Sequence, residues 1–102
     1  MNRIRFSRQS GEDIERVWDY IGIEKGSPDA ASRQVEAIYA TLTLLATQPF
    51  MGEARDDLRR SLRSFPSGNY VILYYPLKDG IEVAGIVHGA QDIEALFRTG
   101  AR

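Results

Sequence analysis

The spacing of apolar residues changes once along the chain, and this change limits the fold more than any other feature of the sequence. From Ile14 to Leu45 the apolar residues recur by steps of three and four, which is the spacing of an amphipathic helix. Beyond Pro49 and Gly52 they gather in short runs rich in β-branched and aromatic residues, which is typical of strands. A helical first half and a strand-forming second half predict the α+β fold class.

Two helices are expected in the first half. The first has Ser7 or Ser10 as its N-cap, ends at Gly26, and carries an apolar stripe made of Ile14, Val17, Trp18 and Ile21. Ser27 and Pro28 begin the second helix as N-cap and first helical residue. Its apolar seam consists of Ala31, Val35, Ile38, Leu42 and Leu45. Because the link around Gly26 is short, the two helices should form an antiparallel hairpin.

The other segments predict strands and a short terminal helix. Ile4 and Phe6 alternate with polar residues and predict an N-terminal strand with one buried face. Three later runs, joined by short turns, predict a three-stranded antiparallel meander over Leu62–Phe65, Tyr70–Tyr75 and Ile81–His88. Gln91–Phe97 adds a short helical segment, and residues 1–102 are expected to form a single domain.

The middle strand of the meander, Tyr70–Tyr75, is apolar on both faces. Such a strand suits the centre of a sheet that carries the helix hairpin on one face. The second face then needs a cover, which could be a partner protein or the C-terminal segment. Without either, it would remain an exposed apolar patch of the kind that marks interaction sites.

The composition excludes several kinds of site. The chain has no cysteines, which rules out disulfides, a thiol nucleophile and a thiolate zinc site. No metal-ligand spacing and no glycine-rich phosphate loop is present, so we expect no metal and no cofactor. No apolar run is long enough for a signal peptide or a membrane span, and we expect a cytoplasmic protein that does not associate with membranes.

Charge argues against sequence-specific binding to nucleic acid. The formal net charge is −1, whereas nucleic-acid-binding domains usually carry a basic excess. The one local basic cluster consists of Arg55, Arg59, Arg60 and Arg63, and it is diluted by Asp56 and Asp57. This cluster is either a solvated face or a contact site for an acidic partner.

His88 is the single histidine and the most plausible acid or base. It ends the last predicted strand, and Arg63 lies on a strand that could be close by. A histidine and a phosphate-binding arginine could cleave RNA through its own 2′-hydroxyl without a metal. The alternative is that His88 binds a backbone carbonyl at the corner after the strand. We favour this structural role, because the sequence offers no second strong acid or base.

Several short segments of the sequence, taken in order, resemble the motifs of a known family. They begin with Phe6-Ser7, Asp13-Ile14 and Val17–Ile21, and continue with Leu45-Ala46, Pro49–Gly52 and Arg55–Leu58. The strongest match is Leu62–Ile72, followed by Asp79–Val83 and His88–Ile93. Over nearly its whole length the chain resembles the ParE branch of the ParE/RelE toxins of bacterial type II toxin–antitoxin systems.

This resemblance implies a toxin without enzymatic activity that blocks DNA gyrase and is neutralised by an antitoxin whose C-terminal segment wraps around it. The open apolar face of the sheet would then be a docking surface. The expected partner-binding residues are Arg59, Arg60, Arg63, Tyr74, Tyr75 and His88.

Two alternatives remain open at this point. The RelE branch has the same fold but cuts messenger RNA on the ribosome, and Arg63 and His88 would then be catalytic. The tail Arg98–Arg102 offers no Tyr, His or Lys of the sort that this branch uses near its end, and the net charge of −1 opposes ribosome binding. The third reading is a non-toxic interaction module of the same fold.

Overall fold

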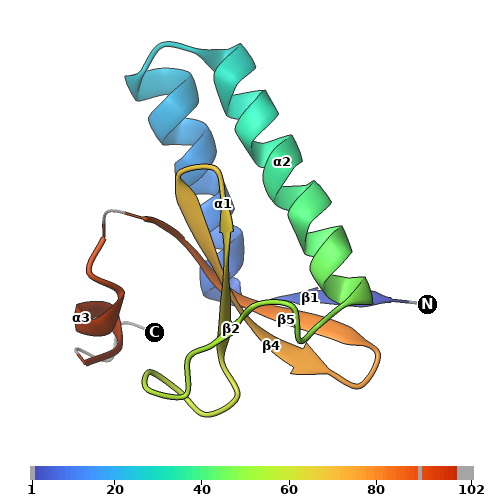
Figure 1. Cartoon of the computed structure of the whole chain (residues 1–102). Helices are drawn as coiled ribbons and strands as arrows, with labels where there is room; N and C mark the ends of the chain where they lie inside the picture. Colours follow the sequence, from blue (N-terminus) through green and yellow to red (C-terminus); the bar gives the residue numbers. More distant parts are fainter. Residues whose placement is uncertain (1, 90, 99–102) are drawn as a thin grey trace.

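The computed structural model describes residues 2–89 and 91–98 and contains one five-stranded sheet with helices on both faces (Figure 1). The elements are β1 (Arg3–Phe6), α1 (Arg8–Trp18), the π-helix η1 (Asp19–Glu24), α2 (Pro28–Thr47), β2 (Glu53–Ala54), β3 (Arg63–Ser67), β4 (Tyr70–Leu77), β5 (Gly80–His88) and α3 (Ile93–Arg98). The strand order is β1-β5-β4-β3-β2, with β1 parallel to β5 and the other pairs antiparallel. The predicted α+β fold is confirmed: an N-terminal strand, a helix hairpin, an antiparallel meander and a short C-terminal helix.

The predicted signals at the helix ends are also present in the structure. The Ser7 hydroxyl accepts a hydrogen bond from the Ser10 N–H at 3.1 Å and caps α1. Ser27 caps α2 in the same way, and Pro28 is the first helical residue. Gly26 has a φ of +67°, a conformation that favours glycine, and it turns the chain between the two helices.

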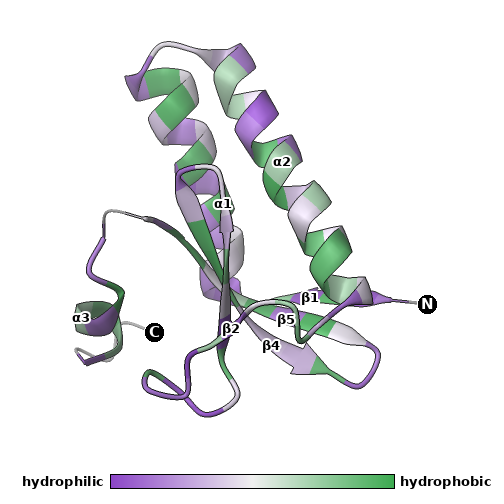
Figure 2. Cartoon of the chain, viewed as in Figure 1, coloured by the Kyte–Doolittle hydropathy of each residue, from purple (hydrophilic) through white to green (hydrophobic). Residues whose placement is uncertain are grey.

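The helix hairpin covers one face of the sheet and encloses the larger core. Every residue of the predicted α2 seam is at most 5% exposed, and Figure 2 shows apolar segments along both helices and along β4 and β5. From the sheet, Ile72, Tyr74 and Val83 pack into the same cluster. The hairpin is therefore held by burial of its seam against the sheet.

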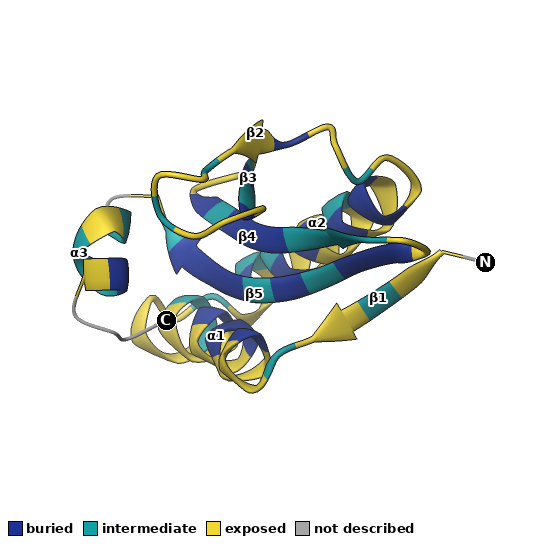
Figure 3. Ribbon diagram, turned by 90° about the horizontal axis from the view of Figure 1, so that it is seen from below, coloured by how far each residue is buried: buried dark blue, intermediate teal, exposed yellow. Residues whose placement is uncertain are grey.

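The opposite face of the sheet carries a second, smaller core. It consists of Leu62, Leu73, Val87 and Phe97, with Ile93 and Leu96 of α3 packed against it. In Figure 3, which views this side, α3 lies at one end of the sheet. Of the covers considered from the sequence, the structure shows the C-terminal segment, which packs on part of this face.

Trp18 was expected in the core but is 41% exposed, whereas Val17 beside it is 2% exposed. Successive side chains of an α-helix point about 100° apart around its axis. Trp18 therefore lies at the edge of the buried stripe made by Asp13, Ile14 and Val17. The π-helix η1 then changes the spacing immediately after it. The prediction relied on the apolar character of Trp18 more than on its angular position.

Two strands continue further than predicted, because each passes through a proline. Pro66 lies in β3 and Pro76 in β4. β2 pairs with β3 only at Arg63 and Ser64, and β3 reaches β4 only as far as Tyr74. Each proline therefore lies where the strand has an unpaired edge, and its missing N–H costs no ladder hydrogen bond.

Candidate functional site

The free edge of β5 lies next to α1 and is closed by side chains. β1 pairs with β5 only as far as Val83. Beyond this point the Ser7 hydroxyl donates to the Ala84 carbonyl at 3.3 Å, and the Asp13 carboxylate accepts from the Ile86 N–H at 2.9 Å. The side-chain carbonyl of Gln91 accepts from the His88 N–H at 2.9 Å. These contacts satisfy backbone groups that a sixth strand would otherwise pair.

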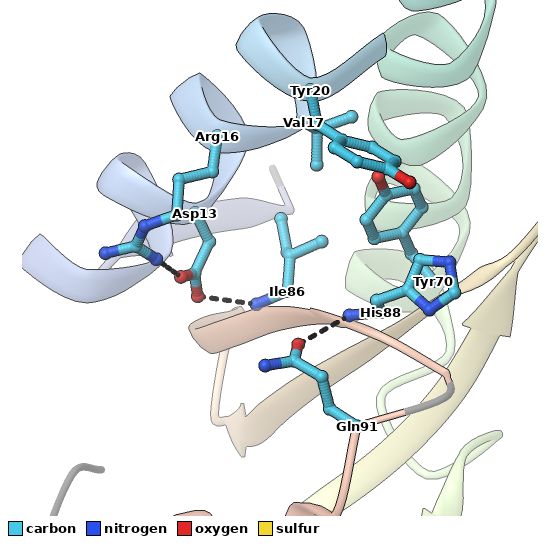
Figure 4. A pocket seen from close by; sticks show the side chains of 8 residues that line it. All are labelled: Asp13, Arg16, Val17, Tyr20, Tyr70, Ile86, His88 and Gln91. Carbon is cyan, nitrogen blue, oxygen red and sulfur yellow. Dashed lines mark hydrogen bonds and ion pairs between the residues drawn. The ribbon is translucent and has the colours of Figure 1, made fainter. Parts of the chain in front are cut away.

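A pocket of about 410 Å³ opens between α1 and this edge. Its lining, drawn in Figure 4, consists of Asp13, Arg16, Val17, Tyr20, Tyr70, Ile86, His88 and Gln91. The four residues from the helical side follow the spacing i, i+3, i+4 and i+7, so they form one face of a helix. Val17 and Ile86 are almost fully buried and give the pocket an apolar floor.

Three aromatic rings form one wall of the pocket. The Tyr70 and His88 rings meet edge to face, with centroids 5.4 Å apart, and Tyr20 projects from η1 toward Tyr70 (Figure 4). Burial raises the pKa of the Tyr70 phenol, and the nearby Tyr20 raises it further. Tyr70 is therefore neutral at physiological pH and can act as a hydrogen-bond donor.

A second pocket of about 400 Å³ shares these three rings. Its other lining residues are Ile21, Lys25, Ala30, Gln34 and Asn69. The two pockets thus lie beside the same rings, under the helix hairpin and at the end of the sheet. We call them together the hairpin groove. A groove that combines an apolar floor with polar side chains at its rim is suited to binding a ligand or a peptide segment.

Arg63 and Tyr74 have a structural task at the other end of the sheet. The Tyr74 hydroxyl donates to the Pro49 carbonyl at 2.8 Å and accepts from the Gly52 N–H at 2.9 Å. The Arg63 guanidinium donates to the carbonyls of Phe50 and Gly52 and lies over the Phe50 ring. Both side chains therefore hold the loop that follows α2.

Tyr74 is 0% exposed, which removes it from the expected partner-binding residues. A Cβ at Gly52 would collide with the Tyr74 hydroxyl, so the loop needs glycine at this close approach. Burial raises the pKa of Tyr74, partly offset by the Gly52 N–H and by Arg63, which both favour the ionised phenol. The phenol is a buried anchor and is not available to a partner.

Arg63 and His88 lie far apart on the sheet. Arg63 is paired with Tyr74, whereas His88 is paired with Tyr70. At about 3.3 Å per residue, the step from Tyr70 to Tyr74 separates the two positions by about 13 Å along the strands. The expectation that they could be close is wrong, and they do not form a joint site for acid–base chemistry.

The other expected partner-binding residues are partly fixed by contacts within the chain. Arg59 lies over the Phe97 ring, 4.8 Å from its centroid, and is exposed, as is Arg60. Tyr75 is half-buried against the smaller core. In the same basic cluster a hydrogen bond to Asp57 raises the pKa of Arg55 and lowers that of Asp57. Asp57 is therefore engaged by Arg55 and is not a free acid.

The described residues hold neither a cluster of metal ligands nor a membrane-spanning helix. Within residues 2–89 and 91–98, no group of three or more His, Asp or Glu side chains could hold a metal ion. In the same part of the chain, no helix combines the length and the apolar character that crossing a membrane requires.

Asp13, Tyr20 and Gln91 were not among the predicted site residues, although all three line the first pocket. Asp13 could have been found, because it is a charged residue on the buried stripe of an amphipathic helix and therefore needs a specific partner. Tyr20 depends on the π-helical turn and Gln91 on the strand edge, and neither feature leaves a local sequence signal.

The chain is similar to known toxins over most of its length. Residues 4–93 match the family model described as ParE toxin of type II toxin-antitoxin system, parDE. The chain is 28% identical to Toxin ParE1 of Caulobacter vibrioides over 93% of this chain and 97% of that protein. It is 27% identical to Toxin ParE3 of the same organism over 93% and 94%. The solved structure described as a chromosomal ParDE TA system from P. aeruginosa has the same fold, with a TM-score of 0.69, 16% identity, and coverage of 86% of this chain and 96% of that chain.

Proposed function

The chain belongs to the ParE family of toxins of type II toxin–antitoxin systems, and from this premise we propose that it inhibits DNA gyrase by binding it and that a cognate antitoxin neutralises it. In this proposal the toxin acts in the cytoplasm, forms and breaks no covalent bond, and needs no metal or cofactor. Under this proposal, its activity depends on the exposed residues through which it binds other proteins.

The observation that carries the proposal is the separation of Arg63 from His88. Cleavage of RNA through its 2′-hydroxyl needs a proton acceptor and a phosphate-binding cation at the same phosphodiester. Arg63 is occupied by the Phe50 and Gly52 carbonyls, and the sheet register holds His88 at a distance. This arrangement supports binding over catalysis.

A protein without catalytic activity can still disable an enzyme by binding one of its states. Gyrase passes through a state in which the DNA is cleaved, and a protein that binds this state more tightly increases its population. To move an equilibrium from 1:99 to 99:1, the affinity for the favoured state must be about 10⁴-fold higher. The proposed inhibition therefore requires strong discrimination between states of gyrase and no chemistry by the toxin.

The proposed partner contacts follow from exposure. Arg59 and Arg60 are exposed, and Arg63, Tyr75 and His88 are half-buried, so all five have surface to offer. Aromatic residues and arginine are frequent at the energetically important positions of interfaces. We propose that these five residues contact gyrase or the antitoxin.

Gyrase inhibition is tested with the purified chain, purified gyrase and relaxed plasmid DNA. We expect loss of supercoiling and an increase in linear DNA after protein digestion. Arg60→Ala should weaken the effect, whereas Arg33→Ala, on the exposed side of α2, should not. Normal supercoiling at a large excess of the chain would overturn the proposal. Cleavage of ribosome-bound messenger RNA that is lost in Arg63→Ala or His88→Ala would assign the chain to the ribonuclease branch instead.

A further inference from the structure

The loop after α2 presents an aromatic side chain that is largely exposed to solvent. The Phe50 ring is 71% exposed, and among the described residues only Ile23, at 75%, is a large apolar side chain with greater exposure. Holding an apolar ring in water is unfavourable, because burial of apolar surface stabilises a protein. The backbone around Phe50 shows that the exposure does not come from a loose chain.

Phe50 lies at the corner of a closed turn. The Met51 N–H donates to the Gln48 carbonyl at 3.0 Å and closes a turn of four residues. Pro49 is the second residue of this turn, where its fixed φ favours the turn conformation. We call residues 48–51 the Phe50 turn.

Two side chains of the sheet hold this turn in place. The buried Tyr74 hydroxyl donates to the Pro49 carbonyl at 2.8 Å, and the Arg63 guanidinium donates to the Phe50 carbonyl at 3.1 Å. Both side chains also bind Gly52, the residue after the turn. Arg63 lies over the Phe50 ring, 5.0 Å from its centroid, so a cation supports the ring on one side. The turn is ordered before any partner binds, and binding therefore loses little conformational entropy.

The Phe50 turn is a surface separate from the hairpin groove. Ala30 lines the groove near the start of α2, whereas the turn follows Thr47, the last residue of that helix. At 1.5 Å per residue these two positions lie about 25 Å apart, and Figure 1 shows them at opposite ends of α2. The shapes also differ, because the groove is hollow whereas the turn projects a ring into solvent. A projecting ring needs a hollow that already exists on a folded partner.

Of the two partners in the proposed function, gyrase fits a fixed, projecting ring. A flexible antitoxin segment that wraps around the toxin has no hollow of its own. Gyrase is a folded enzyme, and its inhibition requires strong preference for one of its states. A fixed ring supplies this preference, because it enters a hollow only where the hollow is open and collides with the enzyme where it is closed. A flexible loop would adapt to several states and discriminate less.

We propose that the Phe50 turn is the part of this chain that inserts into gyrase. The Phe50 ring fills an apolar hollow that is open in the inhibited state, and Met51, which is 36% exposed, adds apolar contact beside it. The exposed part of the Arg63 guanidinium meets acidic or carbonyl oxygens at the rim of that hollow. The inference rests on the proposed function, because it takes gyrase as the target.

The test separates the ring from the support of the turn. Phe50→Ala removes the exposed ring, and its matched control is Ile23→Ala on η1, since the two side chains are 71% and 75% exposed. Tyr74→Phe loosens the turn and leaves the exposed surface unchanged, because Tyr74 is 0% exposed. Thermal unfolding establishes that each variant is folded at the assay temperature.

Two activities are measured for each variant. The first is the concentration of the chain that half-inhibits supercoiling of relaxed plasmid DNA by purified gyrase, together with the amount of linear DNA formed. The second is the affinity, by calorimetry, for the purified product of the short reading frame that adjoins the gene for this chain. The second measurement distinguishes a gyrase contact from an antitoxin contact.

The half-inhibiting concentration should rise by about tenfold or more in Phe50→Ala and by about threefold or more in Tyr74→Phe, and by less than about twofold in Ile23→Ala. Binding of the reading-frame product should stay within about threefold of the wild type in all three variants. Phe50→Ala that inhibits gyrase as well as the wild type would overturn the role of the ring and leave the proposed function in place.

Two other results would also contradict the proposal. If Phe50→Ala lost only the binding of the reading-frame product, the turn would belong to the antitoxin interface. If Tyr74→Phe were fully active, a fixed turn would not be needed. A wild-type chain that does not inhibit gyrase would instead overturn the proposed function itself, and the partner assigned to the turn with it.

Discussion

The Asp13 carboxylate accepts a hydrogen bond from the Ile86 N–H at 2.9 Å, so a side chain of α1 substitutes for a strand at the edge of β5. Asp13→Ala would leave this buried N–H without a partner and would also release Arg16. We expect the free energy of unfolding to fall by about 2–4 kcal/mol, because a hydrogen bond to a charged group is lost and a buried donor is orphaned. Urea denaturation at pH 7 measures this loss.

Asp13→Asn separates the hydrogen bond to Ile86 from the charge that pairs with Arg16, since the amide oxygen can still accept from the Ile86 N–H. It should lose less stability than Asp13→Ala. Glu12→Ala, on the exposed side of the same helical turn, is the control and should change stability by less than about 0.5 kcal/mol. If Asp13→Ala were as stable as Glu12→Ala, the carboxylate would not support the edge of β5.

Tyr74 joins the loop after α2 to the centre of the sheet. Tyr74→Phe keeps the ring but removes two hydrogen bonds, the one that the hydroxyl donates to the Pro49 carbonyl and the one that it accepts from the Gly52 N–H. We expect a loss of about 1–3 kcal/mol and faster proteolysis of the loop, because the buried Gly52 N–H is left unpaired. Tyr75→Phe, on the neighbouring residue of the opposite face, is the control and should leave both measurements near those of the wild type.

The helix hairpin could be predicted from the sequence because the spacing of apolar residues determines which face of a helix is buried. The seam from Ala31 to Leu45 lies in the core as predicted. The strand ends were less accurate, since whether Pro66 or Pro76 can continue a strand depends on how far the neighbouring strand reaches. β2 was missed for the same reason: Glu53 and Ala54 are a strand only because Ser64 and Arg63 lie opposite them.

The candidate site was harder to predict than the fold, because it depends on register. Arg63 and His88 lie in the same sheet. The sequence does not show the register, in which Arg63 pairs with Tyr74 and His88 pairs with Tyr70. Residue type was also misleading for tyrosines: Tyr74 is buried and anchors a loop, whereas Tyr20 is exposed on a π-helical turn and lines the groove. Side-chain chemistry alone does not distinguish these roles.

Stability should fall at alkaline pH because two tyrosines are buried. In the folded chain burial raises the pKa of Tyr70 and Tyr74 above the ordinary value of 10.0. Above about pH 10 the unfolded chain loses these phenol protons while the folded chain retains them, so the unfolded state binds fewer protons. Their contribution is therefore complete below pH 10 and is lost as the pH rises through the raised pKa values.

This pH dependence is measured by urea denaturation between pH 8 and about pH 11. Tyr70→Phe should reduce the loss of stability above pH 10, because one of the two phenols no longer ionises on unfolding. Tyr39→Phe, at an exposed position of α2, should leave the slope as it is in the wild type. The same slope in Tyr70→Phe and the wild type would mean that the Tyr70 phenol is not protected by the fold.

The backbone of Ser61 is strained, since its φ is +68° and it is not a glycine. Ser61→Gly relieves this strain but increases the freedom of the unfolded chain, and the net effect should be a gain of up to about 1 kcal/mol. Ser61→Ala keeps the strain and is the control. Denaturation curves in which Ser61→Gly is less stable than Ser61→Ala would contradict the assignment of strain to this turn.

Leu42 and Leu44 offer the sharpest test of the hairpin seam, because they lie on the same helix with opposite environments. Leu42 is 0% exposed and Leu44 is 43% exposed. Leu42→Asp places an unpaired carboxylate in the core, which costs several kcal/mol against a total stability of about 5–15 kcal/mol, and we expect the chain to unfold. Leu44→Asp should keep the native circular dichroism spectrum and a melting temperature within a few degrees of the wild type. Equal melting temperatures for the two variants would show that the seam is misplaced.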